Sequence, residues 1–361
     1  MYSEKKVGIM SMQRVVNYGS FLQAHSLKNI IQSLGYVNVE FIDYEFEREL
    51  TKFSNDLSIF RRILKHKNVI TFLRMKQHQI QFKKLYAKYL EDLNIKEKKY
   101  TKDVDTLVIG SDEVFNCIQA FPVGYSRGLF GKGYEKSNVI SYAGSFGHTK
   151  LNGLKEYKID KEIGEMFNRF KAISVRDENS KNIVKALLPK KQVLTHLDPV
   201  LVGDFNDVTN RPVKYDNYII VYAYTGRLTR IEEKAIRTFA KKHHKKIISL
   251  GFYQKCADIN LIVHPLDVLS YFKNADFVIT DTFHGTVFSI KTNARFCTIV
   301  RDSNRNKLTS LLKTFGLESQ KVDRIDDIER IYKNEIDFKK CNKKLAEEIV
   351  RSRKYLAEGL K

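Results

Sequence analysis

Proline, cysteine and long apolar runs are scarce in this chain, and each scarcity excludes a class of protein. Only 5 of the 361 residues are proline, which predicts regular secondary structure with few long flexible linkers. The 4 cysteines stand far apart, without CxxC or Cys/His spacing, so we expect reduced thiols and no metal site. No run approaches the roughly 20 apolar residues that span a bilayer, and the first residues lack the apolar stretch of a signal peptide. These absences together predict a cytoplasmic protein.

Acidic residues are also in deficit, since 63 Lys and Arg face 42 Asp and Glu, a formal net charge of +21. Such a charge attracts phosphates, acidic polysaccharide, nucleic acid or anionic lipid, and it is equally typical of a solvated lysine-rich surface. The chain has no zinc-finger, RRM or helix-turn-helix signature, so no nucleic-acid partner is expected. The basic helical stretch 59–90 either packs at a domain edge or contacts anionic membrane at the inner face of the plasma membrane. Nothing indicates an oligomeric state.

The apolar pattern predicts an α/β protein with parallel, doubly wound sheets. The segment 6–11 (KVGIMS) has the composition of a buried strand, 21–36 carries apolar residues at helical spacing, and 37–45 (VNVEFIDYE) resumes a strand. This order recurs along the chain, and its length suits two domains. We expect an N-terminal domain over residues 1–200 with a basic helical insertion at about 46–100, a C-terminal domain over 201–337 and an amphipathic helix over 338–361.

Ligands of parallel sheets bind beyond the carboxyl ends of the strands, so the loops that follow apolar runs carry the candidate site. Three such loops read VNYGS (16–20), GSDEVFN (110–116) and SVRDENS (174–180). Gly19 either permits close approach of a partner or simply closes a tight turn. Asp112 is a base or, with Ser111, a sugar ligand or a helix cap. Arg176 grips a carboxylate or phosphate, or forms a structural ion pair with Asp177.

The fourth loop, TDTFHGT (280–286), is the most specific of the set. His284 stands between the apolar run FVI and an amphipathic helix, with Asp281, Thr282 and Gly285 beside it. A histidine at the mouth of an interdomain cleft suits a general acid or base, or a neutral donor to an anionic ligand. The histidines of KKHHKK, in contrast, are typical of a solvated face.

In their order and spacing, these segments resemble the polysaccharide pyruvyl transferase family over nearly the whole chain. The resemblance rests on VGIMSMQRVVNYGSFLQAHSL, LVIGSDEVFN, SYAGSFG, SVRDENS, LDPVL and PLDVLSYFKNADFVITDTFHGTVFSI. It implies two Rossmann-like domains that face each other across a cleft, as in GT-B enzymes. It also implies transfer of a pyruvyl group from phosphoenolpyruvate to two hydroxyls of a sugar, forming a ketal, with no other cofactor. The acceptor would be a sugar of a cell-surface polysaccharide, such as exopolysaccharide, capsule or cell wall, or a lipid-linked oligosaccharide precursor.

By this resemblance, His284 matches the family's catalytic histidine and Arg176 looks like the arginine that helps to hold the donor. His284 would protonate the methylene carbon or assist the departing phosphate, and Asp112 or Asp281 would be the base. On the donor side we also expect Thr282, Gly285, Thr286, Arg305 and Tyr224, and on the acceptor side Asn17, Tyr18, Gly19, Ser111, Asn116 and Ser145.

One position departs from the family pattern. Relatives carry an arginine two residues before the histidine, in Arg-Leu-His, whereas residues 282–284 of this chain read Thr-Phe-His. Arg301, Arg305 or Lys307, in the loop that follows, are the candidates to supply the missing cation. The same frame would also serve a GT-B glycosyltransferase that uses a nucleotide sugar in surface-polysaccharide synthesis, and this alternative stays open.

Overall fold

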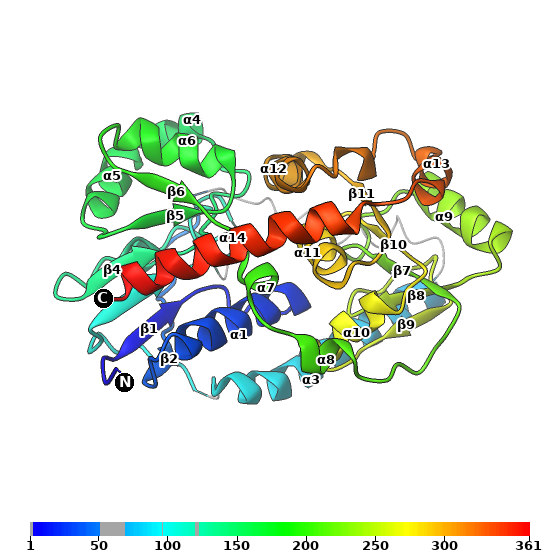
Figure 1. Ribbon diagram of the computed structural model, residues 1–361, viewed down its shortest axis with the longest axis horizontal. Coiled ribbons are helices and arrows are strands. Elements are labelled where there is room, and N and C mark those ends of the chain that lie inside the picture. Colours follow the sequence, from blue (N-terminus) through cyan, green and yellow to red (C-terminus); the bar gives the residue numbers. More distant parts are fainter. Residues whose placement is uncertain (1–2, 51–68, 96, 120–122) are drawn as a thin grey trace.

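The computed structural model describes residues 3–50, 69–95, 97–119 and 123–361. The first half of the chain contributes the strands β1 Val7–Met10, β2 Val39–Phe41, β3 Thr106–Ile109, β4 Asn138–Ser141, β5 Ile173–Val175 and β6 Val193–Thr195. They form a parallel sheet of order β2-β1-β3-β4 and a parallel β5-β6 pair (Figure 1). Isolated bridges from Ile140 to Ala172 and from Gly144 to Val175 join the pair to the sheet beside β4.

The second half contributes β7 Tyr218–Tyr222, β8 Lys246–Leu250, β9 Ile259–Leu261, β10 Phe277–Thr280, β11 Phe296–Ile299 and β12 Lys321–Val322. These strands form one parallel sheet of order β12-β11-β10-β7-β8-β9. Every residue of β7 and β10 is buried, as expected for central strands that helices cover on both faces.

Helices connect and cover the strands. In the first half these are α1 Tyr18–Ser33, α3 Val69–Tyr89, α4 Leu151–Glu156, α5 Asp160–Asn168, α6 Glu178–Leu187, α7 Pro199–Val202 and α8 Asn206–Thr209, with the 3₁₀ turns η2 Leu90–Leu93 and η3 Arg127–Phe130. In the second half they are α9 Arg230–Lys242, α10 Val268–Lys273, α11 Phe283–Thr292, α12 Arg305–Phe315, α13 Asp327–Lys333 and α14 Phe338–Gly359, with η4 Pro265–Asp267, η5 Asp302–Asn304 and η6 Glu318–Gln320.

Side-chain caps fix where the two helices that matter most for the site begin. The Asn17 side chain accepts a hydrogen bond from Ser20 N at 2.7 Å and starts α1. The Thr282 hydroxyl accepts one from Gly285 N at 2.9 Å and starts α11. Each cap satisfies an amide that the helix itself leaves free. As a result α11 starts directly beyond β10, and α1 starts after the loop 11–17 that follows β1.

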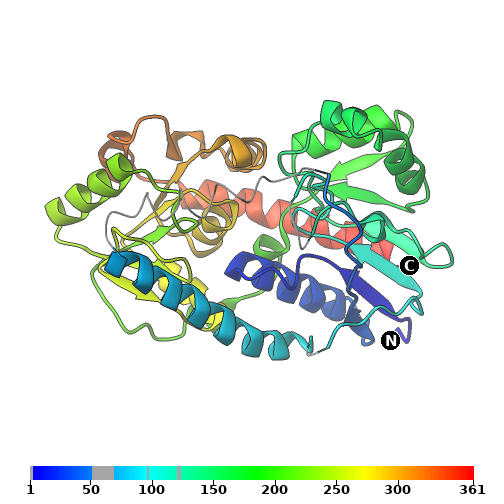
Figure 2. The ribbon, with the colours of Figure 1, turned by 180° about the vertical axis from the view of Figure 1, so that it is seen from behind.

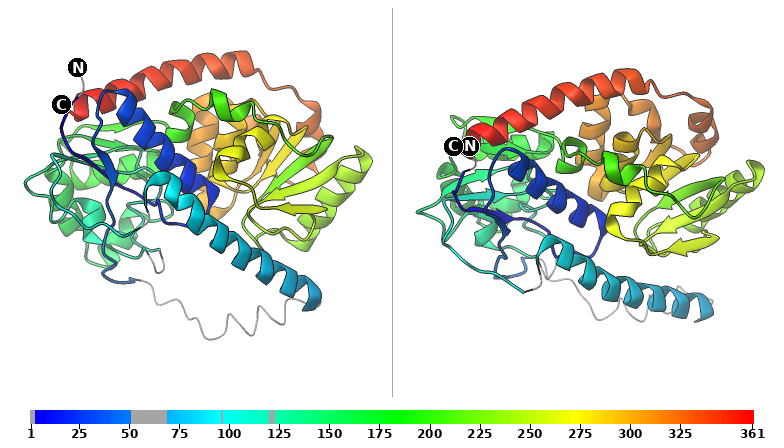
Figure 3. Two further views of the ribbon diagram at one scale, coloured as in Figure 1. Left: turned by 90° about the horizontal axis from the view of Figure 1, so that it is seen from below. Right: turned by 60° about the horizontal axis from the view of Figure 1, so that its bottom comes forward.

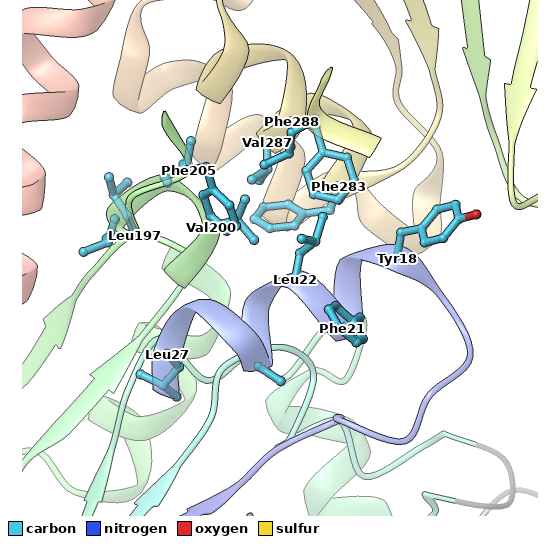
Figure 4. Close-up of a cluster of buried hydrophobic side chains, with 14 of the residues drawn as sticks. Tyr18, Phe21, Leu22, Leu27, Leu197, Val200, Phe205, Phe283, Val287 and Phe288 are labelled. Carbon is cyan, nitrogen blue, oxygen red and sulfur yellow. The ribbon is translucent and has the colours of Figure 1, made fainter. Parts of the chain in front are cut away.

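One hydrophobic cluster joins the two domains. Leu22 of α1, Val200 of α7 and Val287 of α11 point toward one another in it (Figure 4), and all three are fully buried. Two smaller clusters lie within the first and the second domain. The two domains therefore share a common hydrophobic core on one side. The site lies where their strands end.

Two long helices extend along both domains on opposite sides of the molecule (Figures 2 and 3). On one side, Phe82 of α3 packs edge-on against Tyr18, with ring centroids 5.1 Å apart, and against Phe252 of the second domain at 6.3 Å. On the other side, α14 begins beside the second domain and returns to the first. There the Tyr355 hydroxyl donates to Ser141 O at 2.7 Å.

The predicted fold class, two facing Rossmann-like domains of α/β type, is confirmed by this arrangement. The predicted strand–helix–strand opening is confirmed as β1, α1 and β2, although β2 covers only 3 of its expected residues. Of the basic helical stretch 59–90, the part from Val69 onward is helical, and residues 51–68 lie outside the described residues. None of the helices that the structure describes is long and apolar enough to cross a bilayer.

Candidate active site

The carboxyl ends of strands from both sheets meet at one place. Asp112 follows β3, Arg176 follows β5 and His284 follows β10, as the sequence predicts. A fourth residue, Asp198, follows β6 and was missed by the sequence reasoning. Its contacts put it at the centre of the group, because both Arg176 and His284 approach the same carboxylate oxygen, Asp198 Oδ2.

Arg176 is buried and held by two carboxylates. Its Nη1 donates to Asp198 Oδ2 at 2.9 Å and its Nη2 donates to Asp112 Oδ1 at 3.1 Å. The guanidinium also lies over the Phe283 ring, 4.1 Å from the centroid, where cation–π attraction holds it. Asp177, the alternative ion-pair partner, instead caps α6 by accepting from Ser180 N at 2.9 Å. Arg176 is therefore fixed from three sides, while its Nε has no partner among the described residues.

His284 lies in the first turn of α11 and is 8% exposed. Its Nε2 is 3.6 Å from Asp198 Oδ2, beyond hydrogen-bond range, and it has no other partner in the described part of the chain. A Cβ placed on Gly19 would lie only 2.2 Å from His284 Nδ1. The structure thus shows a close approach at Gly19, where the approaching group is the imidazole of His284, and contact of Gly19 with a ligand stays a prediction.

Two opposing effects, burial and ion pairing, determine the ionisation of the carboxyl groups at this centre. Burial alone would raise the pKa of Asp112, but Arg176 and then His284 outweigh it and lower the pKa. For Asp198, His284 and Arg176 likewise outweigh burial, so its pKa is also lowered. Both carboxylates are therefore ionised at neutral pH, which is the state that can accept a proton.

Asp281 faces a different set of partners. Burial raises its pKa to about 6, even though Arg227 and Arg301 counteract the effect. The nearest guanidinium nitrogens are 3.7 Å away in Arg227 and 3.4 Å away in Arg301. The side chain is completely buried. Asp281 therefore lies with the arginines of the second domain and apart from Arg176, and its role as a base stays a prediction.

The three candidates for the missing cation have different surroundings. Arg301 is engaged by both carboxylate oxygens of Glu232, at 2.8 and 3.0 Å. Arg305 pairs with Asp302 at 2.7 Å and is largely exposed. Lys307 forms an ion pair with Glu113 of the first domain and lies 5.8 Å from the centroid of the Phe283 ring. Lys307 thus shares with Arg176 a contact to the Phe283 ring, whereas Arg301 lies beside Asp281.

Most of the residues expected on the acceptor side are buried and interact with other residues of the protein. The Ser111 hydroxyl donates to Gln23 Oε1 at 2.8 Å, and the Ser145 hydroxyl donates to Asp177 Oδ2 at 2.6 Å. Five of these residues are buried, namely Ser111, Ser145, Asn116, Tyr18 and Gly19. The side chain of Asn17 caps α1. Their contact with an acceptor stays a prediction.

The residues expected on the donor side do not form a single cluster. Thr282 caps α11, and Gly285 and Thr286 are buried in its first turn. The Thr286 hydroxyl lies 2.8 Å from that of Thr298. Tyr224 is 39% exposed and stacks on Arg227, 4.6 Å from the guanidinium to the ring centroid. Of this set, Arg176 and Arg305 line a common cavity.

That cavity, which we call the chamber, has a volume of about 770 Å³. It is bounded by α6, the segment from β6 to α7, α12 and α14, and Arg176, Asp198 and Phe283 form part of its wall. Its size suits a small-molecule ligand, since such pockets are roughly 300–1,000 Å³. Within the described ranges, no group of three or more His, Cys, Asp and Glu side chains is arranged to hold a metal ion.

The fold and the site together define a two-domain α/β protein whose catalytic candidates lie at the strand ends of both Rossmann-like domains. The sequence model of the family described as polysaccharide pyruvyl transferase matches residues 17–303. The chain therefore belongs to the polysaccharide pyruvyl transferase family. No curated protein sequence matches it significantly.

Solved structures with a similar course of the chain include UDP-GlcNAc 2-epimerases and an O-GlcNAc transferase. The UDP-GlcNAc 2-epimerase of Methanocaldococcus jannaschii aligns with a TM-score of 0.49 and 13% identity, over 97% of this chain and 99% of that one. The UDP-GlcNAc 2-epimerase of Neisseria meningitidis gives 0.45 and 9%, over 99% of each chain. An O-GlcNAc transferase of Thermobaculum terrenum gives 0.45 and 10%, over 99% of this chain and 66% of that one. At this level of similarity, no ligand or activity is carried over.

Proposed function

We propose that the protein transfers a pyruvyl group from phosphoenolpyruvate to a sugar of a cell-surface polysaccharide or of its lipid-linked precursor, forming a ketal. Family membership supports the reaction class. The observation that carries the proposal is a pair of buried nitrogen atoms, Arg176 Nε and His284 Nε2, that have no hydrogen-bond partner among the described residues. Unsatisfied buried polar groups are rare and call for an explanation, and a ligand that completes them is a direct one.

The donor carries about three negative charges at neutral pH, on a carboxylate and a phosphate, and needs cations and amide donors around it. Arg176 and Arg305 both line the chamber and are the candidates to meet these charges. Because two carboxylates already neutralise Arg176, its part is geometric: it offers the free Nε hydrogen in a fixed position. Lys307, through Phe283, is the candidate to replace the arginine that relatives carry two residues before the histidine.

In the proposed reaction, two sugar oxygens form bonds to C2 of the donor, and the bond from C2 to the phosphate oxygen breaks. His284 delivers a proton to the methylene carbon, which becomes a methyl group. The two hydroxyls release two protons, so one balances the methyl group and the other leaves with the phosphate. We assign Asp112 and Asp198, both ionised, as the acceptors of these protons. The donor brings its own leaving group, so the proposal includes no further cofactor.

Membrane contact and location belong to the same proposal. We place the protein in the cytoplasm, in peripheral contact with the inner face of the plasma membrane. α3 supports this, since it contains five Lys and Arg and no Asp or Glu. Its residues Val69, Leu73 and Ile80, which share one face at helical spacing, are 69%, 60% and 67% exposed. A basic helix with an exposed apolar face fits an anionic bilayer surface.

The test is to replace His284 and to measure donor binding separately from turnover. His284→Ala should lower turnover at least about a hundredfold, because general acid–base groups contribute roughly 10²–10⁴ in rate. The fold should survive, and His243→Ala, at the C-terminal cap of α9 where the ring pairs with Glu329, should keep its activity. A folded and active His284→Ala protein would contradict the catalytic assignment.

Ligand-dependent melting separates the proposal from the glycosyltransferase alternative. A ligand present at about 100 times its Kd stabilises the folded state by about 2.7 kcal/mol. Phosphoenolpyruvate should therefore raise the melting temperature of the wild-type protein. Stabilisation by a nucleotide sugar or a nucleoside diphosphate, with no response to phosphoenolpyruvate, would favour a glycosyltransferase instead.

A further inference from the structure

The chamber is longer than the proposed donor needs. Arg305 and Lys313 both line it, and they stand eight residues apart on α12. At a rise of about 1.5 Å per residue, the wall between them is roughly 12 Å long. The Arg305 end lies near the catalytic group, because Lys307 in the same turn contacts Glu113 and the Phe283 ring. The Lys313 end therefore extends two helical turns beyond it.

The wall that α12 presents to this space is polar along its whole length except at Leu311. Two rows of residues at i, i+4 and i+8 line the chamber, namely Arg305, Thr309 and Lys313, and Asn306, Ser310 and Thr314. Residues at this spacing share one face of a helix. Hydroxyl, amide and cationic groups on one face would be unfavourable as a packing surface against an apolar neighbour. They are the groups that hydrogen-bond the hydroxyls of a sugar.

The charge of the chamber indicates what the sugar carries. Six cationic and three acidic side chains line it, and burial, followed by the nearby Arg351, lowers the pKa of His196 to about 4, so that this histidine is neutral. On α14, Lys344 and Arg351 are compensated by Glu348, at 2.9 and 2.8 Å. Lys181 of α6 and Lys313 of α12, in contrast, have no ion-pair partner in the described part of the chain. Two uncompensated lysines in one polar cavity favour a phosphate group.

We infer that the part of the chamber beyond the donor, toward Lys313, is the acceptor site and that the acceptor is a glycosyl phosphate. Its hydroxyls point toward Asp198 and Arg176, the polar rows of α12 hydrogen-bond the sugar ring, and Lys181 and Lys313 bind the phosphate. This inference rests on the proposed function, and it adds the place where the acceptor binds, the groups that bind it and its charge. A free sugar phosphate and a lipid-linked sugar share this chemistry.

The experiment compares two classes of probe, acceptor and donor, on the intact protein by calorimetric titration. The acceptor probes are a panel of hexose 1-phosphates, the same hexoses without phosphate, inorganic phosphate, and one hexose linked to farnesyl diphosphate. The donor probe is phosphoenolpyruvate. The hexose 1-phosphates should bind at least about tenfold more tightly than the free hexoses, since a charge-assisted hydrogen bond contributes about 1.5–3 kcal/mol. Tighter binding of the farnesyl-linked sugar than of the free phosphate would identify a lipid-linked source, and equal binding a free one.

Three lysine variants locate the binding. Lys313→Gln and Lys181→Gln should each weaken hexose 1-phosphate binding about tenfold, while leaving phosphoenolpyruvate binding unchanged. Lys354→Gln is the matched control, because Lys354 lies on α14, does not line the chamber and is 74% exposed. It should bind both probes as the wild type does.

The possible failures are distinguishable. If phosphoenolpyruvate binds to the wild type but the hexose 1-phosphates do not, or if the Lys313 and Lys181 variants bind them normally, the acceptor assignment is wrong and the proposed reaction stands. If inorganic phosphate binds as tightly as every hexose 1-phosphate, the chamber recognises an ion and no sugar, which also overturns the assignment. If phosphoenolpyruvate does not bind to the wild type, the proposed function itself fails.

Discussion

Within the site, the backbone of Gly19 lies against the imidazole of His284, where any Cβ would come within 2.2 Å of Nδ1. Gly19→Ala should therefore displace His284 and lower kcat/KM roughly a hundredfold, since a shift of about 1 Å in a catalytic group can cost this much. Phosphate release in the presence of both substrates measures it. Gly153→Ala in α4 is the control, because a Cβ there meets nothing within 4 Å. Equal activity of the two variants would show that His284 does not depend on this contact.

Asp281 should make stability depend on pH in an unusual direction. Its pKa is raised to about 6 in the folded protein by burial, whereas an unfolded aspartate has a pKa of about 3.9. The folded state therefore holds the proton more tightly, and this group's stabilisation is full below about pH 4 and is lost as the pH rises through about 6.

The corresponding change in unfolding free energy is up to about 3 kcal/mol, at about 1.4 kcal/mol per pKa unit. Urea unfolding at pH 4.5 and pH 7 measures it. Asp281→Asn should reduce the difference between the two pH values, because an amide does not titrate in this range. If the variant keeps the full wild-type difference, another group causes it.

At the scale of residues, the sequence predicts what depends on local position. Asp112, Arg176 and His284 each directly follow an apolar run, and the rule for strand ends finds them. Asp198 obeys the same rule, since it follows β6 and precedes the proline at the start of α7, so the signal was present and unused. The ion pair of Lys307 with Glu113 joins residues from different domains, and no local pattern contains such a contact.

The element that most directly invites a test is α3, because its two faces differ in role. One face carries Phe82 and Tyr86 into the core, while Leu73 and Ile80 face outward. Ile80→Asp should weaken retention on vesicles that contain phosphatidylglycerol roughly tenfold or more, since burying an isoleucine contributes about 1.5–3 kcal/mol. Co-sedimentation measures it.

Two comparisons make the α3 experiment decisive. Val350→Asp, at a position 68% exposed on α14, introduces the same charge on the opposite side and should bind vesicles as the wild type does. Vesicles of zwitterionic lipid should retain less of the wild-type protein than anionic ones. Equal loss in both variants would mean that net charge, and not the face of α3, governs the binding.

Elements were easier to predict than their contacts. Repeated apolar runs and helical spacing predict the alternating order, and buried strands such as β7 are continuous apolar segments. The bounds were less accurate, since β2 is shorter than expected. The sequence also indicated an amphipathic helix at the end of the chain, but not that this helix returns to β4. That contact joins Tyr355 to Ser141, and only tertiary packing determines it.

On the scale of the whole molecule, the cluster shared by α1, α7 and α11 should make the two domains unfold together. Neither side of this core is complete without the other, so separate unfolding of one domain would expose the apolar surface of both. The chain has no tryptophan, so a single introduced tryptophan reports on one domain. Tyr157→Trp serves the first domain and Tyr332→Trp the second.

Both probes should give the same urea midpoint and the same m-value. Calorimetry of the wild-type protein should correspondingly show one heat-absorption peak. Two separated midpoints, with the tryptophan variants otherwise as stable as the wild type, would mean that the shared core does not couple the domains.

The return of α14 to the first domain also gives the molecule an order of assembly in time. The strands of that domain are complete once β6 has been made, yet the helix that packs on Ile140 and Ser141 comes some 160 residues later. At about 5–20 residues per second, translation takes roughly ten to thirty seconds to reach it. During that interval the part of the first domain around Ile140 and Ser141 is folded without the helix that covers it in the finished molecule.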